Sequence, residues 1–156
     1  MSTQEPAPHV FRKAGTAESV TAVDFGTEPD KYDFALTRDD TLGRYSLVDM
    51  KLSPQFDSNP GHSHREHSET FYMISGQMEW TVEGETHVLG PGDTVFIPPY
   101  AHHIAKTVGD ESPHVLLIWE PAGWEVGMVE SANLTPEQRA DQEFMADFRV
   151  RNDTYI

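Results

Sequence analysis

The chain has 156 residues, a formal net charge of −15 and no cysteine, and each of these properties excludes some kinds of protein. A chain of this length suits a single domain that buries roughly 70% of its unfolded surface, so it needs no cross-link to fold. The missing cysteines exclude a disulfide framework, a thiolate metal site and a cysteine nucleophile. The negative charge repels nucleic acid and anionic lipid, so neither is an expected partner.

The first residues carry no recognisable targeting signal. Residues 1–8 hold two prolines and small polar residues, which predicts a flexible arm. No basic stretch followed by an apolar segment occurs there, so we expect no signal peptide. No apolar run in the sequence approaches the roughly 20 residues of a membrane span, and we therefore expect a soluble cytoplasmic protein.

Short strands separated by turns are the pattern that follows. A short edge strand is expected between residues 9 and 23, where apolar positions are sparse. Further along, turn residues bound runs that are rich in β-formers. These runs predict strands at residues 32–37, 43–52, 69–75, 78–82, 86–89, 94–97, 102–108 and 114–120. Such a rhythm is typical of a sandwich or barrel, so we predict an all-β domain over residues 9–130.

The C-terminal residues 131–156 change character. Thr135 precedes Pro136 and an acidic first turn, which is typical of a helix start. We predict a helix over residues 136–147. Three apolar residues near its end would lie near one face: Phe144, Met145 and Phe148. We expect this helical tail to pack on the outside of the barrel or on a partner subunit, in a structural role.

A dense cluster of metal-capable side chains precedes the strand at residues 69–75. Four of them fall within eight residues: His62, His64, His67 and Glu69. In an extended segment, side chains two apart face the same way, so His62 and His64 can aim both imidazoles at one point. Glu69 can return a carboxylate to that point. A second histidine pair, at residues 102–103, lies further along the chain, and the metal hypothesis depends on whether the two clusters meet.

The pattern of these residues resembles the two sequence motifs of the cupins. The first motif, His-x-His, four residues, Glu, six residues, Gly, is met by His62, His64, Glu69 and Gly76. The second motif is matched in spacing by Gly92, Pro98 and His103. The resemblance implies a double-stranded β-helix, that is, a cupin jelly-roll barrel with a C-terminal helix. It also implies one divalent transition metal held by His62, His64, Glu69 and His103.

Three positions depart from the cupin pattern. Phe56 and Tyr100 stand where the motifs usually have glycine, and Thr107 replaces the closing asparagine. Glycine at such a turn normally serves a backbone with positive φ, so Tyr100 predicts a different turn. This leaves His102 and His103 as alternative ligands. Neighbouring strand residues face opposite ways, so only one of the two points inward, and the motif spacing favours His103.

Three imidazoles and one carboxylate form a ligand set that suits Fe, Mn, Ni, Co or Zn as a divalent ion. Four protein ligands leave two octahedral positions open, as catalysis requires. Large apolar residues would face inward around the metal, which favours an aromatic or polyketide-like substrate over a sugar. The predicted pocket residues are Phe56, Phe71, Met73, Met78, Trp80, Phe96 and Trp119. His67, between the motif positions, is expected at the rim.

The resemblance leaves three functions open. The first is a quercetinase-like dioxygenase, in which Glu69 would be both ligand and base for an enolisable substrate and dioxygen would attack the activated ring. That double role requires a loosely held carboxylate, and a raised pKa would favour it. The second is a polyketide cyclase or isomerase that uses the metal as a Lewis acid. The third is a non-catalytic ligand-binding cupin. The family also implies a homodimer.

Overall fold

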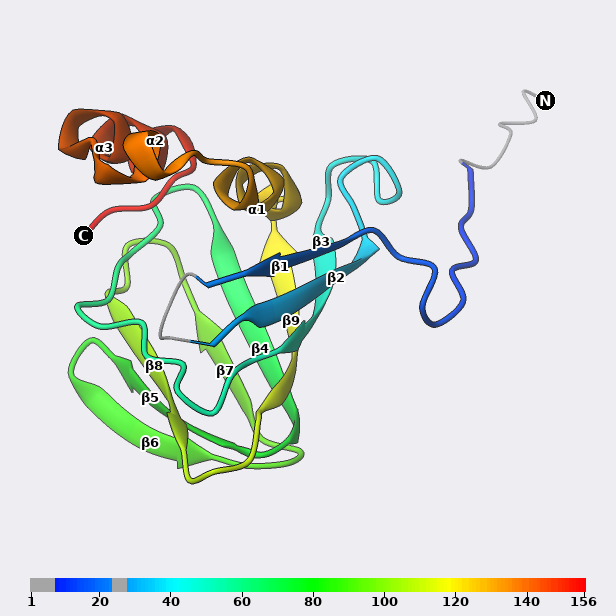
Figure 1. Ribbon diagram of the computed structural model, residues 1–156. Coiled ribbons are helices and arrows are strands. Elements are labelled where there is room, and N and C mark those ends of the chain that lie inside the picture. The colour runs from blue at the N-terminus through cyan, green and yellow to red at the C-terminus, as the bar shows by residue number, and fades with distance from the viewer. Residues whose placement is uncertain (1–7, 24–27) are drawn as a thin grey trace.

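The computed structural model describes residues 8–23 and 28–156, so the predicted N-terminal arm falls outside it except for its last residue. Within this part of the chain, nine strands form two antiparallel sheets that face each other as a jelly-roll sandwich (Figure 1). The strands are β1 (Ser19–Ala22), β2 (Asp30–Leu36), β3 (Ser46–Lys51), β4 (Ser68–Ser75), β5 (Gln77–Val82), β6 (Glu85–Leu89), β7 (Thr94–Ile97), β8 (His103–Val108) and β9 (His114–Glu120). The predicted all-β fold is confirmed.

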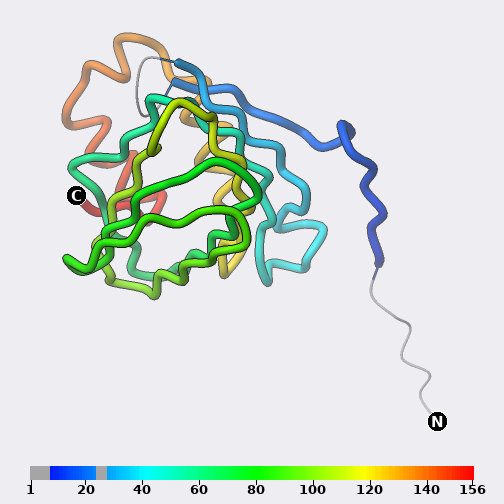
Figure 2. The backbone as a smooth tube through the Cα atoms, turned by 90° about the horizontal axis from the view of Figure 1, so that it is seen from below, coloured from blue at the N-terminus to red at the C-terminus, as the bar shows by residue number. Residues whose placement is uncertain are grey.

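The larger sheet has the order β1-β2-β3-β9-β4-β7 and the smaller one the order β6-β5-β8. The expected edge strand before residue 23 is β1, which pairs only with β2 among the described strands. The segment that precedes β1 runs away from the barrel in both backbone views (Figures 1 and 2).

Alternating burial along the strands builds the core between the sheets. Every second residue of a half-buried strand faces the same side, so one apolar set per strand points inward. On β4 the buried set is Glu69, Phe71 and Met73, and on β9 it is Val115, Leu117 and Trp119. β5 adds Met78 and Trp80 from the opposite sheet. Glu69 is thus a carboxylate in a position that would otherwise hold an apolar core residue.

The C-terminal region forms three helices, α1 (Trp124–Ala132), α2 (Pro136–Ala140) and α3 (Gln142–Arg151). The predicted start at Pro136 is confirmed, and Thr135 and Gln138 form a capping box there. The predicted single helix is divided at Asp141, whose side chain accepts hydrogen bonds from the backbone amides of Glu143 and Phe144 in the first turn of α3. No membrane-spanning length of apolar helix occurs in the described residues.

The helix α1 was not expected. It contains Val126, Gly127 and Val129, which are weak helix formers, so local propensity did not predict it. Tertiary contacts fix its start instead. The buried carboxylate of Glu125 accepts hydrogen bonds from the Arg38 amide at 2.7 Å and from the Ser46 hydroxyl at 2.5 Å. Because α1 starts at Trp124, helical structure begins earlier than the residue 131 at which the sequence placed the start of the helical tail.

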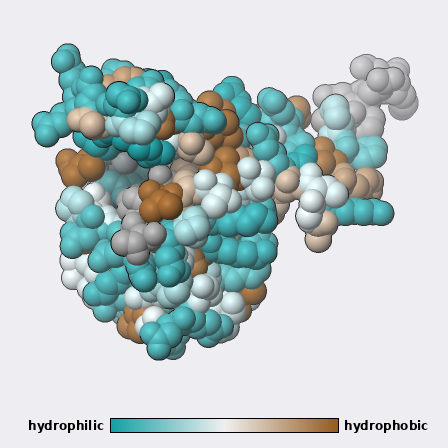
Figure 3. All heavy atoms as spheres, in the orientation of Figure 1, coloured by the Kyte–Doolittle hydropathy of each residue, from teal (hydrophilic) through white to brown (hydrophobic). Residues whose placement is uncertain are grey.

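The three helices lie together over one end of the barrel (Figure 1). Their outward-facing surface is mainly hydrophilic in the space-filling view (Figure 3). The tail therefore packs on the outside of the barrel, one of the two expected positions, and does so at one particular end. The tail lies over the barrel end that contains the histidine cluster, and residues of all three helices line the pocket there.

Candidate metal centre and pocket

Four donor side chains converge inside the barrel. One ligand-capable atom from each of His62, His64, Glu69 and His103 lies within 4.8 Å of the corresponding atoms of the other three. Glu69 comes from the start of β4 and His103 from the start of β8. The two histidine clusters therefore meet, as the metal hypothesis requires.

Direct backbone pairing brings the two motif segments together. The amide of His62 donates to the carbonyl of His103 at 3.1 Å, and the amide of His103 returns a bond to the carbonyl of His62 at 2.9 Å. Gly61 makes this approach possible because its φ is +87° and a Cβ atom there would lie 2.5 Å from Cγ1 of Ile104. Only glycine combines that conformation with that space.

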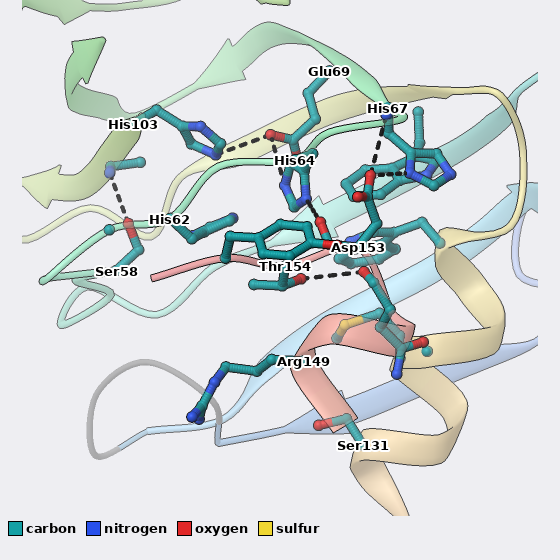
Figure 4. A pocket seen from close by; sticks show the side chains of 18 of the residues that line it. Ser58, His62, His64, His67, Glu69, His103, Ser131, Arg149, Asp153 and Thr154 are labelled. Carbon is teal, nitrogen blue, oxygen red and sulfur yellow. Dashed lines mark hydrogen bonds and ion pairs between the residues drawn. The ribbon is translucent and has the colours of Figure 1, made fainter. Parts of the chain in front are cut away.

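Backbone carbonyls fix two of the imidazoles. Nδ1 of His64 lies 2.6 Å from the carbonyl oxygen of Asp153, and Nδ1 of His103 lies 3.1 Å from that of Ala101. A carbonyl oxygen only accepts, so each Nδ1 carries the hydrogen and each Nε2 is left to bind a metal. Both Nε2 atoms face Oε2 of Glu69, at 3.5 Å from His64 and 3.0 Å from His103 (Figure 4).

The charges in this cluster are set by burial and by the neighbouring groups. Burial, followed by repulsion from His103, lowers the pKa of His62 to about 3, so this imidazole is neutral at pH 7. Burial also opposes a charge on His64, but the negatively charged Glu69 carboxylate beside it outweighs burial and raises the pKa of His64. Burial would raise the pKa of Glu69, yet the neighbouring imidazoles of His103 and His64 hold it below its ordinary value. The pKa of Glu69 is thus lowered and not raised, which does not favour its expected double role as ligand and base.

The donor set fits a divalent metal. Nε2 of His64 and Oε2 of Glu69 are fully buried, and neither finds a hydrogen bond of good geometry within the described residues although they lie at ion-pair distance. Buried polar atoms without such a partner are costly unless something else binds them. Three imidazoles and a carboxylate are the ligands that a borderline divalent ion accepts.

His103 and not His102 joins the cluster. His103 is buried and His102, its neighbour, is exposed, as alternation along β8 demands. The different turn expected at Tyr100 is wrong, because Tyr100 itself adopts a φ of 70°. Its amide donates to the carbonyl of His64, so the strained turn is held against the first motif. The tyrosine thus keeps the conformation for which glycine is usual.

A cavity of about 600 Å³ opens beside the cluster, and its wall includes His62, His64, Glu69 and His103. Five of the seven predicted pocket residues line it: Phe56, Phe71, Met78, Trp80 and Trp119. The other two are not among its lining residues. Met73 is fully buried in the core, and Phe96 is 59% exposed. On β7 it is Ile97, paired with Glu69, that faces inward, so the expectation for Phe96 was off by one residue.

The helical tail supplies lining residues that the sequence patterns did not reveal. Trp124 and Met128 of α1 and Arg149 of α3 border the cavity, as does Asp153 beyond α3. His67, expected at the rim, also lines it and donates from Nδ1 to the Asp153 carboxylate at 2.6 Å (Figure 4). Helical periodicity marks which face of a helix is apolar but not what that face covers, so no local signal identified these residues.

Comparison with known proteins gives two matches at the level of sequence. A family model described as a cupin domain matches residues 48–119. The chain is also 35% identical to quercetin 2,3-dioxygenase from Bacillus subtilis (strain 168) over 63 residues, and these residues make up 40% of this chain. The matched segment spans only 18% of that enzyme's length.

Solved structures reproduce the fold. An RmlC-like cupin from Shewanella frigidimarina superposes with a TM-score of 0.60 at 19% identity, over 76% of this chain and 96% of that one. The polyketide cyclase RemF from Streptomyces resistomycificus gives a TM-score of 0.56 at 21% identity, over 73% of this chain and 81% of the cyclase. At these identities the similarity concerns the jelly roll alone.

Proposed function

This chain belongs to the cupin superfamily, and from that premise we propose that it is a metal-dependent dioxygenase that acts on an aromatic, enolisable small molecule. The observation that carries the proposal is the convergence of four donor atoms on the wall of a mainly apolar cavity that includes several aromatic rings. In a structural metal site, protein ligands fill the coordination sphere, whereas a catalytic site keeps a coordination position open for substrate. A cavity beside the four ligands is what a catalytic site requires.

In this proposal His62, His64, Glu69 and His103 hold one divalent metal. A redox-active metal bound there supplies Lewis acidity toward a substrate oxygen and one-electron chemistry toward dioxygen. The pKa of Glu69 lies below its ordinary value, so this residue is an anion at neutral pH, the form that a metal binds. Its proposed second role, accepting the proton of a substrate hydroxyl, rests on its position at the cavity wall and not on its pKa, because a lowered pKa makes a weaker base.

The remaining walls orient the substrate. Phe71 and Trp80 pack with their ring centroids 4.4 Å apart, and Trp119 lies edge-on to His64 at 4.6 Å. These rings offer flat apolar surfaces that suit an aromatic ring system. The helical tail covers the same end of the barrel and would restrict water around the reacting atoms.

The similarity to quercetin 2,3-dioxygenase supports the choice of reaction. The alternative is a cyclase or isomerase reaction, in which the same ligands polarise a carbonyl and no oxygen is consumed. The likeness to the polyketide cyclase concerns the fold and does not favour this alternative over the first.

Oxygen uptake tests the proposal. Protein loaded separately with Fe(II), Mn(II), Co(II) or Ni(II) is mixed with a flavonol or another aromatic enediol in an oxygen electrode. The expected result is consumption of dioxygen in step with loss of substrate, reduced at least about a hundredfold in Glu69→Gln, which lacks both the base and an anionic metal ligand. Substrate conversion without oxygen uptake would establish the cyclase or isomerase reading, and binding without conversion would establish a ligand-binding cupin.

A further inference from the structure

The last residues of the chain lie against the first motif. We call residues 153–155 the C-terminal strap. Ser63 donates its amide to the carbonyl of Tyr155 at 2.8 Å, and Tyr155 returns a bond to Ser63 at 3.0 Å. The Arg65 guanidinium also lies over the Tyr155 ring, 3.8 Å from its centre. An isolated antiparallel bridge therefore joins the strap to the segment that carries His62 and His64.

One residue of the strap holds the loop that follows His64. The Asp153 carboxylate accepts hydrogen bonds from three successive backbone amides, those of Arg65 at 3.0 Å, Glu66 at 2.9 Å and His67 at 3.2 Å. It also accepts from Nδ1 of His67 at 2.6 Å (Figure 4). Bonds to an ionised acceptor are the stronger kind, and Asp153 is 7% exposed, which shields them from solvent.

The same residue contacts a ligand through its backbone. The Asp153 carbonyl accepts the Nδ1 hydrogen of His64 at 2.6 Å, in a buried position. Asp153 has a φ of 53°, a conformation that aspartate tolerates better than most residues. The carboxylate of Asp153 accepts four hydrogen bonds from residues 65–67, and these bonds fix the whole residue. The backbone carbonyl that orients His64 is thereby held in place.

We propose that Asp153 is a positioning residue of the metal centre, through which the C-terminal strap fixes the tautomer and direction of His64. The inference rests on the proposed function in one respect, that the cluster binds a metal. Thermodynamic coupling between two sites is reciprocal. If the strap, bound against the first motif, strengthens metal binding, then a bound metal must also stabilise the strap in that position. Loss of a partner that orients a metal-binding histidine typically weakens metal affinity by about 10–100-fold.

The variant Asp153→Asn tests this coupling. Asparagine keeps the size and the tolerance for positive φ, but it presents one oxygen where the carboxylate accepts four bonds. Zn(II) affinity is measured by competition with a chromophoric chelator, and the visible spectrum of the Co(II) form reports the ligand geometry. We expect Zn(II) binding to weaken by about 10–100-fold and the Co(II) spectrum to change. An unchanged Zn(II) affinity in a folded variant would overturn the inference.

The matched control is Asp147→Asn, the same chemical change at an exposed position of α3, where the carboxylate pairs with Arg151 at 3.5 Å. It should leave Zn(II) affinity unchanged. Thermal unfolding of both metal-free variants shows whether a loss of affinity exceeds a loss of stability. If Asp147→Asn weakens Zn(II) binding as much as Asp153→Asn, the effect is not specific to the strap and the inference is wrong.

A measurement on the unmodified protein keeps the inference testable if Asp153→Asn does not fold. Saturation with Zn(II) should slow hydrogen exchange of the Arg65, Glu66 and His67 amides, because the bound metal holds the strap. The amide of Gly90, which donates to the Asp93 carboxylate at 2.9 Å in an exposed turn, serves as the control and should not respond. Equal exchange with and without Zn(II) would contradict the coupling. If the unmodified protein binds no metal at all, the proposed function fails instead.

Discussion

His64 donates its Nδ1 hydrogen to the backbone carbonyl of Asp153, a residue 89 positions further along the chain. This bond joins the first motif of the barrel to the segment that follows the last helix. The barrel and the helical tail are therefore parts of one site, since the tail borders the cavity and also orients a candidate ligand. A change in the tail should act on metal binding as well as on substrate access.

Replacing either histidine of the second pair separates the two ligand assignments. His103→Ala removes a donor that lies 3.0 Å from Glu69 and should weaken Zn(II) binding by more than the roughly 10–100-fold seen when only an outer partner is lost. His102→Ala changes the exposed neighbour and should alter the affinity by no more than about twofold, as surface changes do. Chelator competition on both variants gives the answer. A large loss in His102→Ala with none in His103→Ala would reverse the assignment.

Metal binding should depend on pH through His64. The raised pKa of His64 means that in metal-free protein its imidazole takes up a proton more readily than usual, beside the Glu69 anion. A metal needs the neutral ring, so binding expels this proton and affinity falls as pH drops below the raised pKa, by about tenfold per pH unit for one proton. His62, with a pKa of about 3, adds no proton release near neutral pH.

Calorimetry of Zn(II) binding in buffers of different ionisation enthalpy counts the released protons, and a titration series from about pH 5 to pH 8 covers the ordinary range of histidine. Affinity should rise with pH and then level off above the pKa of His64. If the affinity is the same at both ends of the series, the His64–Glu69 pair does not control binding.

Close backbone approach at Gly61 should make that position intolerant of any side chain. A Cβ atom on Gly61 would lie 2.6 Å from the His103 carbonyl oxygen, so Gly61→Ala must push the two motif segments apart. Gly84→Ala is the matched control because Gly84 has a similar φ of +83° and no atom within 4 Å of the added Cβ. Chemical denaturation measures both free energies of unfolding.

The control should lose about 1–2 kcal/mol, the cost of the left-handed conformation alone. Gly61→Ala should lose clearly more than that and should also bind Zn(II) more weakly, since His62 and His103 pair directly beside it. If the free energy of unfolding fell equally in the two variants, the close approach of the backbone at Gly61 would contribute nothing beyond the cost of the left-handed conformation.

The sequence predicted the parts of the site that follow strand geometry and motif spacing. Glu69 and His103 face inward because residues alternate along a strand. That rule allowed only one of His102 and His103 to point inward, and the motif spacing favoured His103. The same rule failed at Phe96, because on a four-residue edge strand a shift of one residue turns the side chain outward. Asp153 was beyond prediction, since its contact with His64 runs through a backbone carbonyl that every residue type possesses.

The turn at Tyr100 offers a last prediction, about stability. Tyr100 has a φ of 70° and is 71% exposed, so its side chain gains little from burial while its backbone adopts a strained conformation. Tyr100→Gly should therefore raise the free energy of unfolding by up to about 1 kcal/mol, because glycine adopts positive φ without a steric penalty. Tyr100→Ala makes the same truncation but keeps the strain, so it should not stabilise. Thermal and denaturant unfolding of the two variants separates the effect of relieving the positive φ from the effect of removing the tyrosine side chain. If alanine stabilised the protein as much as glycine, the gain would come from losing the tyrosine ring and not from relief of the turn.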